Sequence, residues 1–341
     1  MSSVAAELAP TRTRRLRFGG VDYEVLPKET VLDALLRHGL DVPFSCKKGV
    51  CQSCLMRATD GAVPATAQHG LKETLRDHGC FLSCLCRPTE DLDLAAPDDA
   101  LAFVRATVTR VERLSPAVAR VRLTPAEPFE YRAGQFVSLR RSDGLTRSYS
   151  LASVPRLDDH LEIHVKRLSC GEMSTWIFDR LQPGETVDLA GPNGTGYYLP
   201  GRPEQPLLLI GNGTGLAPLI GIAHDALAEG HSGPIDLYHG TRHGEGLYLH
   251  RDLTELAERY ENFRYHPCLS GPARMQGCKA GRAEAIAFAD HTTLSGCRVF
   301  LCGYPPMVKA AKKAAYLAGA ALDDIHADPF ELRELRRVPR D

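Results

Sequence analysis

Residues 45–54 read SCKKGVCQSC and place Cys46, Cys51 and Cys54 at the spacing Cx4Cx2C. Thiolates at this spacing can bind soft metal ions if the backbone between them curls around the site and points its N–H groups at the sulfurs. Gly49 supplies the conformational freedom that a curled loop requires. The stretch therefore predicts a small metal-binding domain built around this loop.

The spacing is that of a plant-type [2Fe-2S] loop, which needs a fourth thiolate ligand. The segment GCFLSCLCRP offers Cys80, Cys84 and Cys86, and spacing alone does not choose among them. A structural zinc site is one alternative, but such sites usually pair two Cx2C motifs. Reduced core cysteines are another, but six of the eleven cysteines fall between residues 46 and 86, too tight a cluster for that reading. The cysteines favour an iron–sulfur cluster.

A hairpin and a helix precede the cysteine loop. Residues 14–25 (RRLRFGGVDYEV) alternate about a Gly-Gly turn, which predicts two short strands. Thr30 and Asp33 form a capping pattern ahead of an apolar helix, and Gly39 ends that helix. We expect this first domain to span residues 12–97.

The pattern of apolar residues and turns in the remaining chain predicts two further domains. Residues 103–203 hold alternating segments such as LEIHVK, separated by Gly, Pro and Asp turns, which predict an antiparallel barrel. Residues 204–333 alternate strands with helices, including a helix at 306–321, and predict a parallel sheet. The fold class is therefore multidomain, α+β and α/β.

Composition excludes several classes of protein. The chain has 341 residues, of which 24% are charged and 43% hydrophobic, with a formal net charge of -1. Disorder, a collagen-like fibre and nucleic-acid binding fit these values poorly. The longest uncharged stretch, residues 206–223, is broken by Gly, Pro, Asn and Thr, and the N-terminal residues lack the apolar core of a signal peptide. We expect a cytoplasmic protein that binds neither nucleic acid nor membrane.

A flavin site is indicated by Arg147-Ser148-Tyr149-Ser150 at a strand end and by the turn from Gly171 to Ser174. An isoalloxazine ring stacks on an aromatic face and takes a hydroxyl near its reactive nitrogen, while its phosphates take a cation and free backbone amides. These residues offer each group. The alternative is an ordinary exposed strand end.

A nicotinamide site is indicated by GNGTG at 211–215, between a buried strand and an apolar helix. Glycines there let a pyrophosphate approach the helix N-terminus. A later strand ends in Leu301-Cys302-Gly303, and ligands of parallel sheets bind at the carboxyl ends of the strands, which places Cys302 beside the nicotinamide. The alternatives are a turn that only packs a helix on a sheet and a buried structural cysteine.

The three motifs together resemble a known family, the one-chain NADH-dependent reductase components of bacterial multicomponent oxygenases. The resemblance runs from about residue 14 to 331. It implies a ferredoxin β-grasp domain, an FAD-binding antiparallel β-barrel and an NAD-binding α/β domain. It also implies that NADH passes hydride to FAD, and that single electrons continue through the [2Fe-2S] cluster to a terminal oxygenase component, Rieske or diiron, or to a separate ferredoxin.

The resemblance also assigns residues. It selects Cys84 as the fourth ligand, in a Leu-x-Cys segment before a proline, and gives Arg147 to the flavin phosphate, Tyr149 to ring stacking and Ser150 to flavin N5. Ser150 and Cys302 are the expected catalytic residues. The expected cluster ligands are Cys46, Cys51, Cys54 and Cys84. The expected cofactor-binding residues are Arg147, Ser148, Tyr149, Ser150, His164, Val165, Lys166, Gly171, Met173, Ser174, Gly211, Gly213, Thr214, Gly215, Cys302, Gly303 and, near the C-terminus, Phe330.

Several alternatives stay open. The acceptor could be a deoxysugar dehydrase, a cytochrome P450 or a quinone, and a non-enzymatic carrier or sensor, or a zinc-stabilised flavoprotein, is a different class. Asn212 replaces a glycine that is common in the family's nicotinamide loop. The strand at 235–240 ends without the acidic residue that binds a ribose diol, and Arg242 either holds a 2′-phosphate or faces solvent. The resemblance favours NADH.

Overall fold

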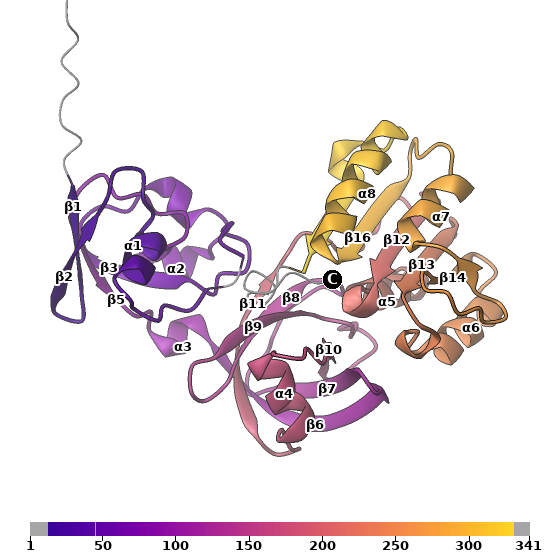
Figure 1. Cartoon of the computed structure of the whole chain (residues 1–341), viewed down its shortest axis with the longest axis horizontal. Helices are drawn as coiled ribbons and strands as arrows, with labels where there is room; N and C mark the ends of the chain where they lie inside the picture. The colour runs from indigo at the N-terminus through magenta and orange to yellow at the C-terminus, as the bar shows by residue number, and fades with distance from the viewer. Residues whose placement is uncertain (1–12, 45, 331–341) are drawn as a thin grey trace, which may run out of the picture. The chain divides into compact units, whose positions relative to one another are not determined.

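The computed structural model describes residues 13–44 and 46–330 (Figure 1). The chain divides into two compact units between Phe103 and Val104. Two ends of the expected domains, residue 12 and residues 331–333, lie outside the described residues. Within the described ranges, none of the helices combines the length and the apolar character needed to cross a bilayer.

The first unit is a five-stranded sheet with short helices. Its elements are β1 (Arg14–Phe18), β2 (Val21–Val25), α1 (Val31–Arg37), β3 (Leu55–Asp60), a 3-10 turn (Ala65–Gln68), α2 (Glu73–Asp77), β4 (Cys80–Leu82), β5 (Leu92–Ala95) and α3 (Asp99–Ala102). The strand order is β2-β1-β5-β3-β4, with β1 parallel to β5 and the other pairs antiparallel. This arrangement agrees with the expected ferredoxin-like domain.

Helix α1 closes the core of the first unit. Thr30 caps it as expected, because its hydroxyl accepts a hydrogen bond from the backbone N–H of Asp33 at 3.1 Å. The apolar face of α1 packs against the sheet, and Leu32, Leu35 and Phe81 are fully buried there. The same core includes Cys54 and Cys84, so the cysteine loop is anchored on the folded sheet.

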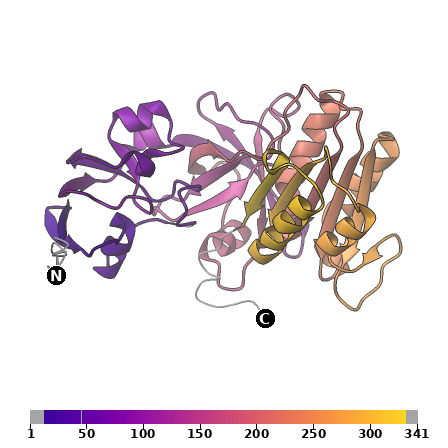
Figure 2. The ribbon, with the colours of Figure 1, turned by 90° about the horizontal axis from the view of Figure 1, so that it is seen from above.

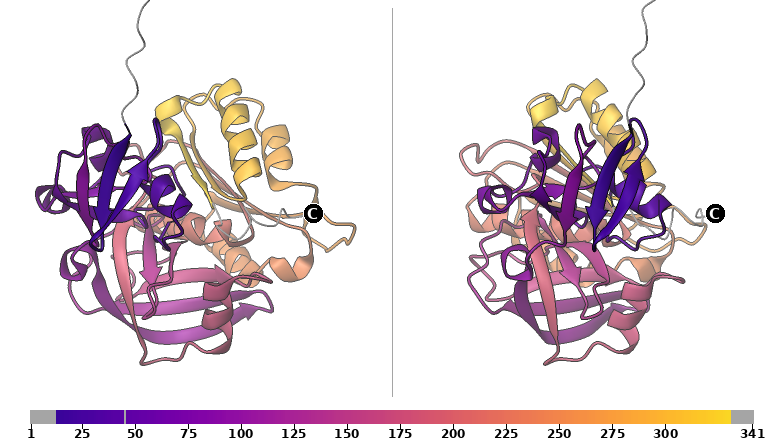
Figure 3. Two further views of the ribbon diagram at one scale, coloured as in Figure 1. Left: turned by 60° about the vertical axis from the view of Figure 1, so that its left-hand side comes forward. Right: turned by 90° about the vertical axis from the view of Figure 1, so that its left-hand side faces the viewer.

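The second unit begins with an antiparallel barrel. Its elements are β6 (Val104–Ser115), β7 (Val118–Pro125), β8 (Phe136–Arg140), β9 (Thr146–Ser150), β10 (Leu161–Lys166), α4 (Glu172–Asp179) and β11 (Thr186–Asn193). The strand order is β10-β7-β6-β11-β8-β9, and the strands curve around a common core (Figure 3). A bridge between Leu151 and Ile163 joins the two edge strands, so the sheet closes on itself. The expected turn at residues 171–174 is the start of α4.

The second unit ends with a parallel sheet. Its elements are β12 (Leu207–Asn212), a 3-10 turn (Gly213–Gly215), α5 (Leu216–Ala228), β13 (Ile235–Thr241), a 3-10 turn (Gly244–Gly246), α6 (His250–Arg259), β14 (Phe263–Leu269), β15 (Lys279–Ala280), α7 (Ala283–Asp290), β16 (Arg298–Gly303), α8 (Pro305–Leu317), a 3-10 turn (Leu322–Asp324) and β17 (Ile325–Pro329). The order β15-β14-β13-β12-β16-β17 is parallel throughout. Helices α5 and α6 cover one face, and α7 and α8 cover the other (Figure 2).

The helix expected at 306–321 is shorter than predicted, and two strands of this sheet lack a strong sequence pattern. Helix α8 ends at Leu317 rather than at residue 321, because the chain turns at Gly319, where φ is 98°. Strand β14 (FRYHPCL) carries a proline and charged residues, and β17 (IHADP) is short and polar, so neither has the apolar run that marks a buried strand. Strand β17 nonetheless brings the chain back to the carboxyl end of β16.

Candidate functional site

The cysteine loop curls because three of its residues have left-handed backbone angles. These are Lys47, Gly49 and Gln52, with φ of 54°, 76° and 55°. The curl points backbone N–H groups at sulfur: Lys48 N lies 3.3 Å from Cys46 Sγ, and Cys51 N lies 3.4 Å from the same atom. Donors that already surround a sulfur stabilise a thiolate there, as a metal cluster requires.

Gly49 is required by close packing as well as by its backbone angle. A β-carbon at Gly49 would lie 2.3 Å from Cδ1 of Leu85, the residue after Cys84. The two cysteine-bearing segments therefore approach each other closely at this point. A backbone hydrogen bond from Gly49 also reaches the Cys84 thiol and helps to lower its pKa.

The four expected ligands form two thiol pairs. A hydrogen bond from the Cys51 thiol, together with backbone N–H groups, lowers the pKa of Cys46 to about 5 and raises that of Cys51. In the same way a hydrogen bond from Cys54 lowers the pKa of Cys84, while the pKa of Cys54 is raised. Among the described residues, no group of three or more His, Cys, Asp or Glu side chains is arranged around a single metal position. Each pair could hold one iron of a [2Fe-2S] cluster.

The other two candidates for the fourth ligand lie apart from these pairs. Cys80 is fully buried in β4, where it pairs in register with Arg57 of β3. Cys86 is also fully buried, and burial raises the pKa of its thiol to about 12. Only Cys84 of the three candidates has a hydrogen bond to another cysteine thiol among the described residues. The geometry therefore favours Cys84 as the fourth ligand.

The candidate flavin residues line the end of β9. Arg147, Ser148 and Tyr149 are half-buried, and Ser150 is buried. The Ser148 hydroxyl lies 3.2 Å from that of Ser138 on β8, and a guanidinium nitrogen of Arg147 donates to the carbonyl of Thr146 at 2.8 Å. The four residues of the motif thus follow one another along a single strand end of the barrel.

The start of α4 forms the second part of the candidate flavin site. The Ser174 hydroxyl accepts from the N–H of Leu168 at 3.1 Å and donates to the carbonyl of Gly171 at 3.0 Å, which fixes the turn. The backbone N–H groups at the beginning of α4 face away from the helix and can receive a phosphate. Met173 and Val165 pack their side chains into the barrel core, so they can reach a cofactor only through their backbone.

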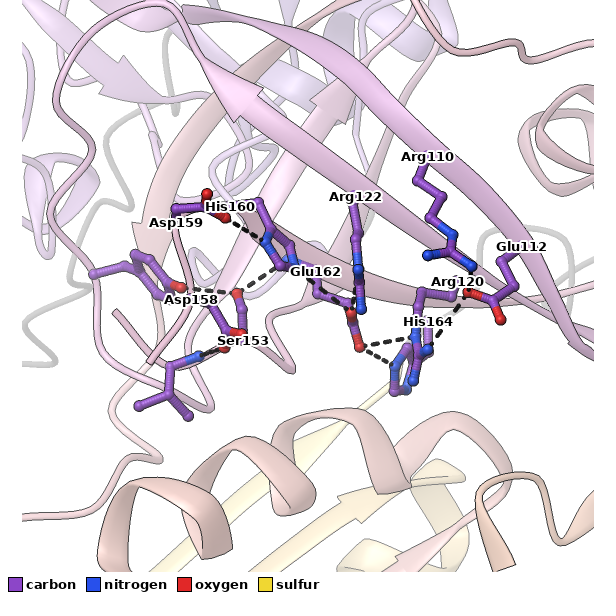
Figure 4. Close-up of polar contacts among 12 residues, drawn as sticks. Arg110, Glu112, Arg120, Arg122, Ser153, Asp158, Asp159, His160, Glu162 and His164 are labelled. Atoms are coloured by element: carbon purple, nitrogen blue, oxygen red, sulfur yellow. Dashed lines mark hydrogen bonds and ion pairs between the residues drawn. The ribbon is translucent and has the colours of Figure 1, made fainter. Parts of the chain in front are cut away.

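His164 lies in a buried ionic cluster rather than at an open surface (Figure 4). Its Nε2 lies 3.0 Å from a carboxylate oxygen of Glu162, which also pairs with Arg120 and Arg122 at 3.1 and 3.0 Å. Burial raises the pKa of Glu162, but these partners lower it overall to about 2, and burial lowers the pKa of His164. Its Nδ1 lies 3.3 Å from the hydroxyl of Tyr248. The imidazole therefore joins the barrel to the nicotinamide part of the unit, and its expected cofactor contact is limited to the backbone.

The glycine loop between β12 and α5 packs directly on the end of β16. A β-carbon at Gly215 would lie 2.3 Å from the carbonyl oxygen of Cys302 and 3.1 Å from the α-carbon of Gly303. On the open side, the Lys166 ammonium lies 3.9 Å from the position of a β-carbon on Gly213. The loop thus offers helix-terminal N–H groups and a nearby cation, the pair of features that a pyrophosphate takes.

The side chain of Asn212, at a position where the family commonly has a glycine, makes a hydrogen bond that a glycine could not make. Its side-chain oxygen accepts a hydrogen bond from the backbone N–H of Tyr304 at 2.8 Å. This bond ties the glycine loop to the segment that follows β16. The substitution therefore adds a contact to the expected nicotinamide loop.

Ser150, Cys302 and Asp328 meet where the barrel approaches the parallel sheet. The Ser150 hydroxyl donates to the Asp328 carboxylate at 3.1 Å, and Asp328 pairs in register with Cys302. Burial raises the pKa of Asp328 to about 6 and also raises that of the Cys302 thiol. Just beyond, the N–H of Phe330 donates to the carbonyl of Gly303 at 2.7 Å. The structure thus places each of the two expected catalytic residues next to Asp328.

Asp328 is the residue of this junction that sequence reasoning did not single out. It is 178 residues from Ser150 along the chain, and only the return of β17 brings them together. Its one sequence signal is its place in the ADPF segment, two residues before Phe330.

Three family models match successive parts of the chain, one for each of the three expected domains. They are the 2Fe-2S iron-sulfur cluster binding domain at residues 18–89, the oxidoreductase FAD-binding domain at 105–198 and the oxidoreductase NAD-binding domain at 209–313. Among curated proteins, the reductase subunit of an aromatic O-demethylase from an Amycolatopsis species is 36% identical over 92% of this chain and 97% of its own length.

The chain belongs to the family of ferredoxin–NAD(P)+ reductase components of oxygenase systems.

Other members of this reductase family agree in length and fold. The reductase component of a naphthalene 1,2-dioxygenase system from Pseudomonas putida is 31% identical over 88% of this chain and 93% of its own length. The crystal structure of an Amycolatopsis cytochrome P450 reductase superposes with a TM-score of 0.66, at 34% identity, and covers 93% of this chain and 99% of that one. The ferredoxin reductase of carbazole 1,9a-dioxygenase, at 24% identity and a TM-score of 0.65, covers 94% and 98% and shows the shared fold.

Proposed function

We propose that this reductase takes hydride from NADH and delivers single electrons to a terminal oxygenase component. When bound, FAD converts the two-electron donation of NADH into one-electron steps, and the [2Fe-2S] cluster relays each electron. The observation that carries the proposal is the meeting of Ser150, Cys302 and Asp328 beside the glycine loop, in a chain whose other unit holds the cysteine pairs.

The residues of the second unit would position both cofactors. Arg147 and the start of α4 would hold the flavin phosphates, and Tyr149 would lie against the ring. The loop from Gly213 to Gly215, with the Lys166 ammonium nearby, would hold the pyrophosphate of the dinucleotide. The hydrogen bond to Asp328 orients the Ser150 hydroxyl, which would face the reacting edge of the flavin.

The junction also provides a titratable group for proton balance. Hydride transfer delivers two electrons and one proton together, whereas the onward transfers carry single electrons, so a proton must leave the site. Asp328, with a pKa near 6, lies 3.1 Å from the Ser150 hydroxyl and can exchange that proton through it.

In the first unit, Cys46 and Cys51 would hold one iron, and Cys54 and Cys84 the other. The backbone N–H groups of Lys48 and Cys51 would donate to Cys46 Sγ, and hydrogen bonds to sulfur tune the reduction potential of such clusters. We propose the domain limits 12–97, 103–203 and 204–333, since each encloses one of the three matched families.

The acceptor remains one of two kinds of oxygenase. Relatives at 30–31% identity are named for dioxygenase and hydroxylase systems, which suits a Rieske or diiron component. A solved structure at 34% identity is named as a cytochrome P450 reductase, which suits a P450 acceptor. Because this match is more similar than the dioxygenase and hydroxylase relatives at 30–31%, we propose a cytochrome P450 as the first acceptor to test.

The test is direct reduction of a purified acceptor under anaerobic conditions. The cofactor-loaded reductase and NADH are mixed with a cytochrome P450 under carbon monoxide, or with a Rieske oxygenase whose visible spectrum reports reduction. Rapid reduction of one acceptor that is lost in the Cys84→Ser variant supports the proposal. Reduction that persists unchanged in Cys84→Ser would show that electrons bypass the cluster, and it would contradict the proposed route.

A further inference from the structure

A buried group of imidazole and phenol rings lies beside the expected nicotinamide loop, and the proposed hydride route does not use it. Its members are His164, His239, Tyr248 and Tyr265, of which the first three are at most 4% exposed. Polar rings are costly to bury unless their polar atoms find partners. The contacts among these four rings therefore determine what the group does.

Tyr248 stands between two of the imidazoles, one from each part of the second unit. Its ring meets the His164 ring of the barrel strand β10 edge to face, with ring centroids 5.4 Å apart and an interplanar angle of 88°. It meets the His239 ring of β13 in the same way, at 5.6 Å and 83°. Edge-to-face pairs hold aromatic rings in a defined orientation. Tyr248 therefore links the barrel to the parallel sheet.

The hydrogen bond between Tyr248 and His164 has a definite direction. Burial lowers the pKa of His164, so its imidazole is neutral at neutral pH. Its Nε2 lies 3.0 Å from the Glu162 carboxylate and carries the ring hydrogen, because an ionised carboxylate only accepts. Nδ1 is then an acceptor, and the Tyr248 hydroxyl donates to it at 3.3 Å. Loss of this hydroxyl would leave Nδ1 without its donor in a buried site.

His239 continues the link to the glycine loop. It pairs in register with Gly211, the first residue of that loop. Burial lowers the pKa of His239 to about 4, and a hydrogen bond with the backbone of Gly213 opposes this effect. Its Nδ1 lies 3.4 Å from the hydroxyl of Tyr265 on β14. The neutral imidazole thus supports the loop from within the sheet.

The barrel strand β10 approaches the same loop from the other side. Ile163 and Val165 point into the barrel core, so His164 and Lys166 lie on the outer face of the strand. The Lys166 ammonium lies 3.9 Å from the position of a β-carbon on Gly213. Residues 164–166 are also expected to contact the flavin cofactor. A shift of β10 against β13 would therefore move the expected flavin site relative to the nicotinamide loop.

The backbone next to Tyr248 is strained. Leu249, the residue before α6, has φ of 60° and ψ of 19°, a left-handed conformation that is uncommon for leucine. Strain of this kind persists where the surrounding packing requires it, and it is concentrated at functional sites. The strained residue accompanies the turn that places Tyr248 in the core before α6 begins.

We propose that Tyr248 is a positioning residue for hydride transfer, which holds β10 at a fixed distance from the nicotinamide loop by joining His164 to His239. The inference rests on the proposed function and adds how the chain sets the separation of its two expected cofactor sites. The rate depends steeply on this separation, since a misplacement of about 1 Å costs roughly a hundredfold. Removal of the Tyr248 hydroxyl therefore slows the hydride step while both cofactors still bind.

Tyr198→Phe is a matched control for Tyr248→Phe. The Tyr198 hydroxyl also lies 3.3 Å from a histidine Nδ1, that of His231, with ring centroids 5.5 Å apart at 88°, and Tyr198 is likewise 3% exposed. His231 precedes β13, whereas the glycine loop follows the parallel strand β12, so this pair lies at the opposite edge of the sheet. The two variants delete the same hydroxyl from equivalent buried pairs, and only one pair lies beside the loop.

Two measurements on the cofactor-loaded reductase separate positioning from binding. Stopped-flow reduction of the flavin at increasing NADH concentration gives a limiting rate, and calorimetric titration with NAD+ gives a Kd that does not depend on turnover. Tyr248→Phe is expected to lower the limiting rate about tenfold or more and to keep the Kd within about threefold. Tyr198→Phe is expected to keep both values within about twofold of the parent. Both variants lose a buried hydrogen bond, so both melting temperatures should fall by similar amounts.

Each outcome decides the inference. A limiting rate in Tyr248→Phe equal to that in Tyr198→Phe would overturn it, and so would a weaker affinity for NAD+ with an unchanged limiting rate. In either case NADH would still reduce the flavin of the parent protein, and the proposed function would stand. Failure of NADH to reduce the parent's flavin would instead refute the proposed function.

Flavin and cluster absorbance per chain confirm that each variant is loaded. If Tyr248→Phe loses its flavin, His239→Leu is measured in its place, because leucine has a similar volume and removes the polar contacts on the other side of the link. The same slowing is expected, and a limiting rate equal to that of Tyr198→Phe would again overturn the inference.

Discussion

The Gly215→Ala substitution probes the packing on which the nicotinamide site depends. The new β-carbon would lie 2.3 Å from the carbonyl oxygen of Cys302 and 2.7 Å from its carbonyl carbon, both atoms of the β16 backbone. Ordinary carbon–oxygen contact needs about 3.4 Å, so the loop and the strand end must separate by roughly 1 Å. Overpacking of this kind costs about 1–3 kcal/mol in stability. A displacement of about 1 Å at a reacting centre costs roughly a hundredfold in rate.

The assay is stopped-flow reduction of the bound flavin by saturating NADH. Gly215→Ala is expected to slow this step roughly a hundredfold. Its cluster spectrum should be unchanged, because the cysteine pairs lie in the other unit. Gly196→Ala is the matched control, since its β-carbon would meet only Cβ of His326 at an ordinary 3.7 Å. A Gly215→Ala variant that reduces flavin as fast as Gly196→Ala would refute the proposed packing of the glycine loop against Cys302.

Three further predictions test the other parts of the site. Cys84→Ser should remove the cluster, while flavin stays bound and NADH still reduces ferricyanide. Cys86→Ser should keep the cluster, because the Cys86 thiol is buried outside the two pairs. Iron content and visible spectra measure both outcomes, and the reverse pattern would show that the ligand assignment is wrong. Arg147→Ala should weaken flavin binding by roughly tenfold or more, because a charged phosphate loses its partner, and full flavin occupancy after dilution would count against this role. Asp328→Asn should flatten the pH dependence of the free energy of unfolding. Burial raises the Asp328 pKa from 3.8 to about 6, so the neutral carboxyl group contributes its full stability below pH 3.8, and this contribution is lost as the pH rises through 6. The change in the free energy of unfolding is at most about 3 kcal/mol. Flavin release on heating measures this effect from about pH 4 to about pH 7, and an Asn variant whose melting temperature follows that of the parent across this range would show that Asp328 does not titrate there.

Local patterns predicted the parts of the molecule that depend on local chemistry. The cysteine loop is set by the spacing of its cysteines and by Gly49, which adopts a positive φ, and Thr30 caps α1 by contacts within one helical turn. The glycine loop follows a buried strand and opens a helix, as the sequence predicted. In each case the residues that decide the structure are neighbours in the chain.

Local sequence patterns did not predict the contacts between segments that are far apart in the chain. The Ser150–Asp328 hydrogen bond depends on β17, a short polar strand that pairs in parallel with β16. His164 was expected to contact a cofactor, yet its imidazole pairs with Glu162 and Tyr248, because β7, β10 and the segment before α6 converge there. The choice of Cys84 over Cys86 needed a family resemblance, since both lie in one segment and differ only in which thiol faces the loop.

The central claim is that electrons from NADH enter at the flavin and leave through the cluster. Anaerobic rapid-freeze electron paramagnetic resonance, with flavin absorbance followed in parallel, tests it most directly. With NADH, the parent protein should bleach its flavin first and then develop the signal of a reduced [2Fe-2S] cluster, Cys84→Ser should bleach without that signal, and Arg147→Ala depleted of flavin should show neither change. A cluster signal that appears at the parent rate in flavin-depleted Arg147→Ala would contradict the account.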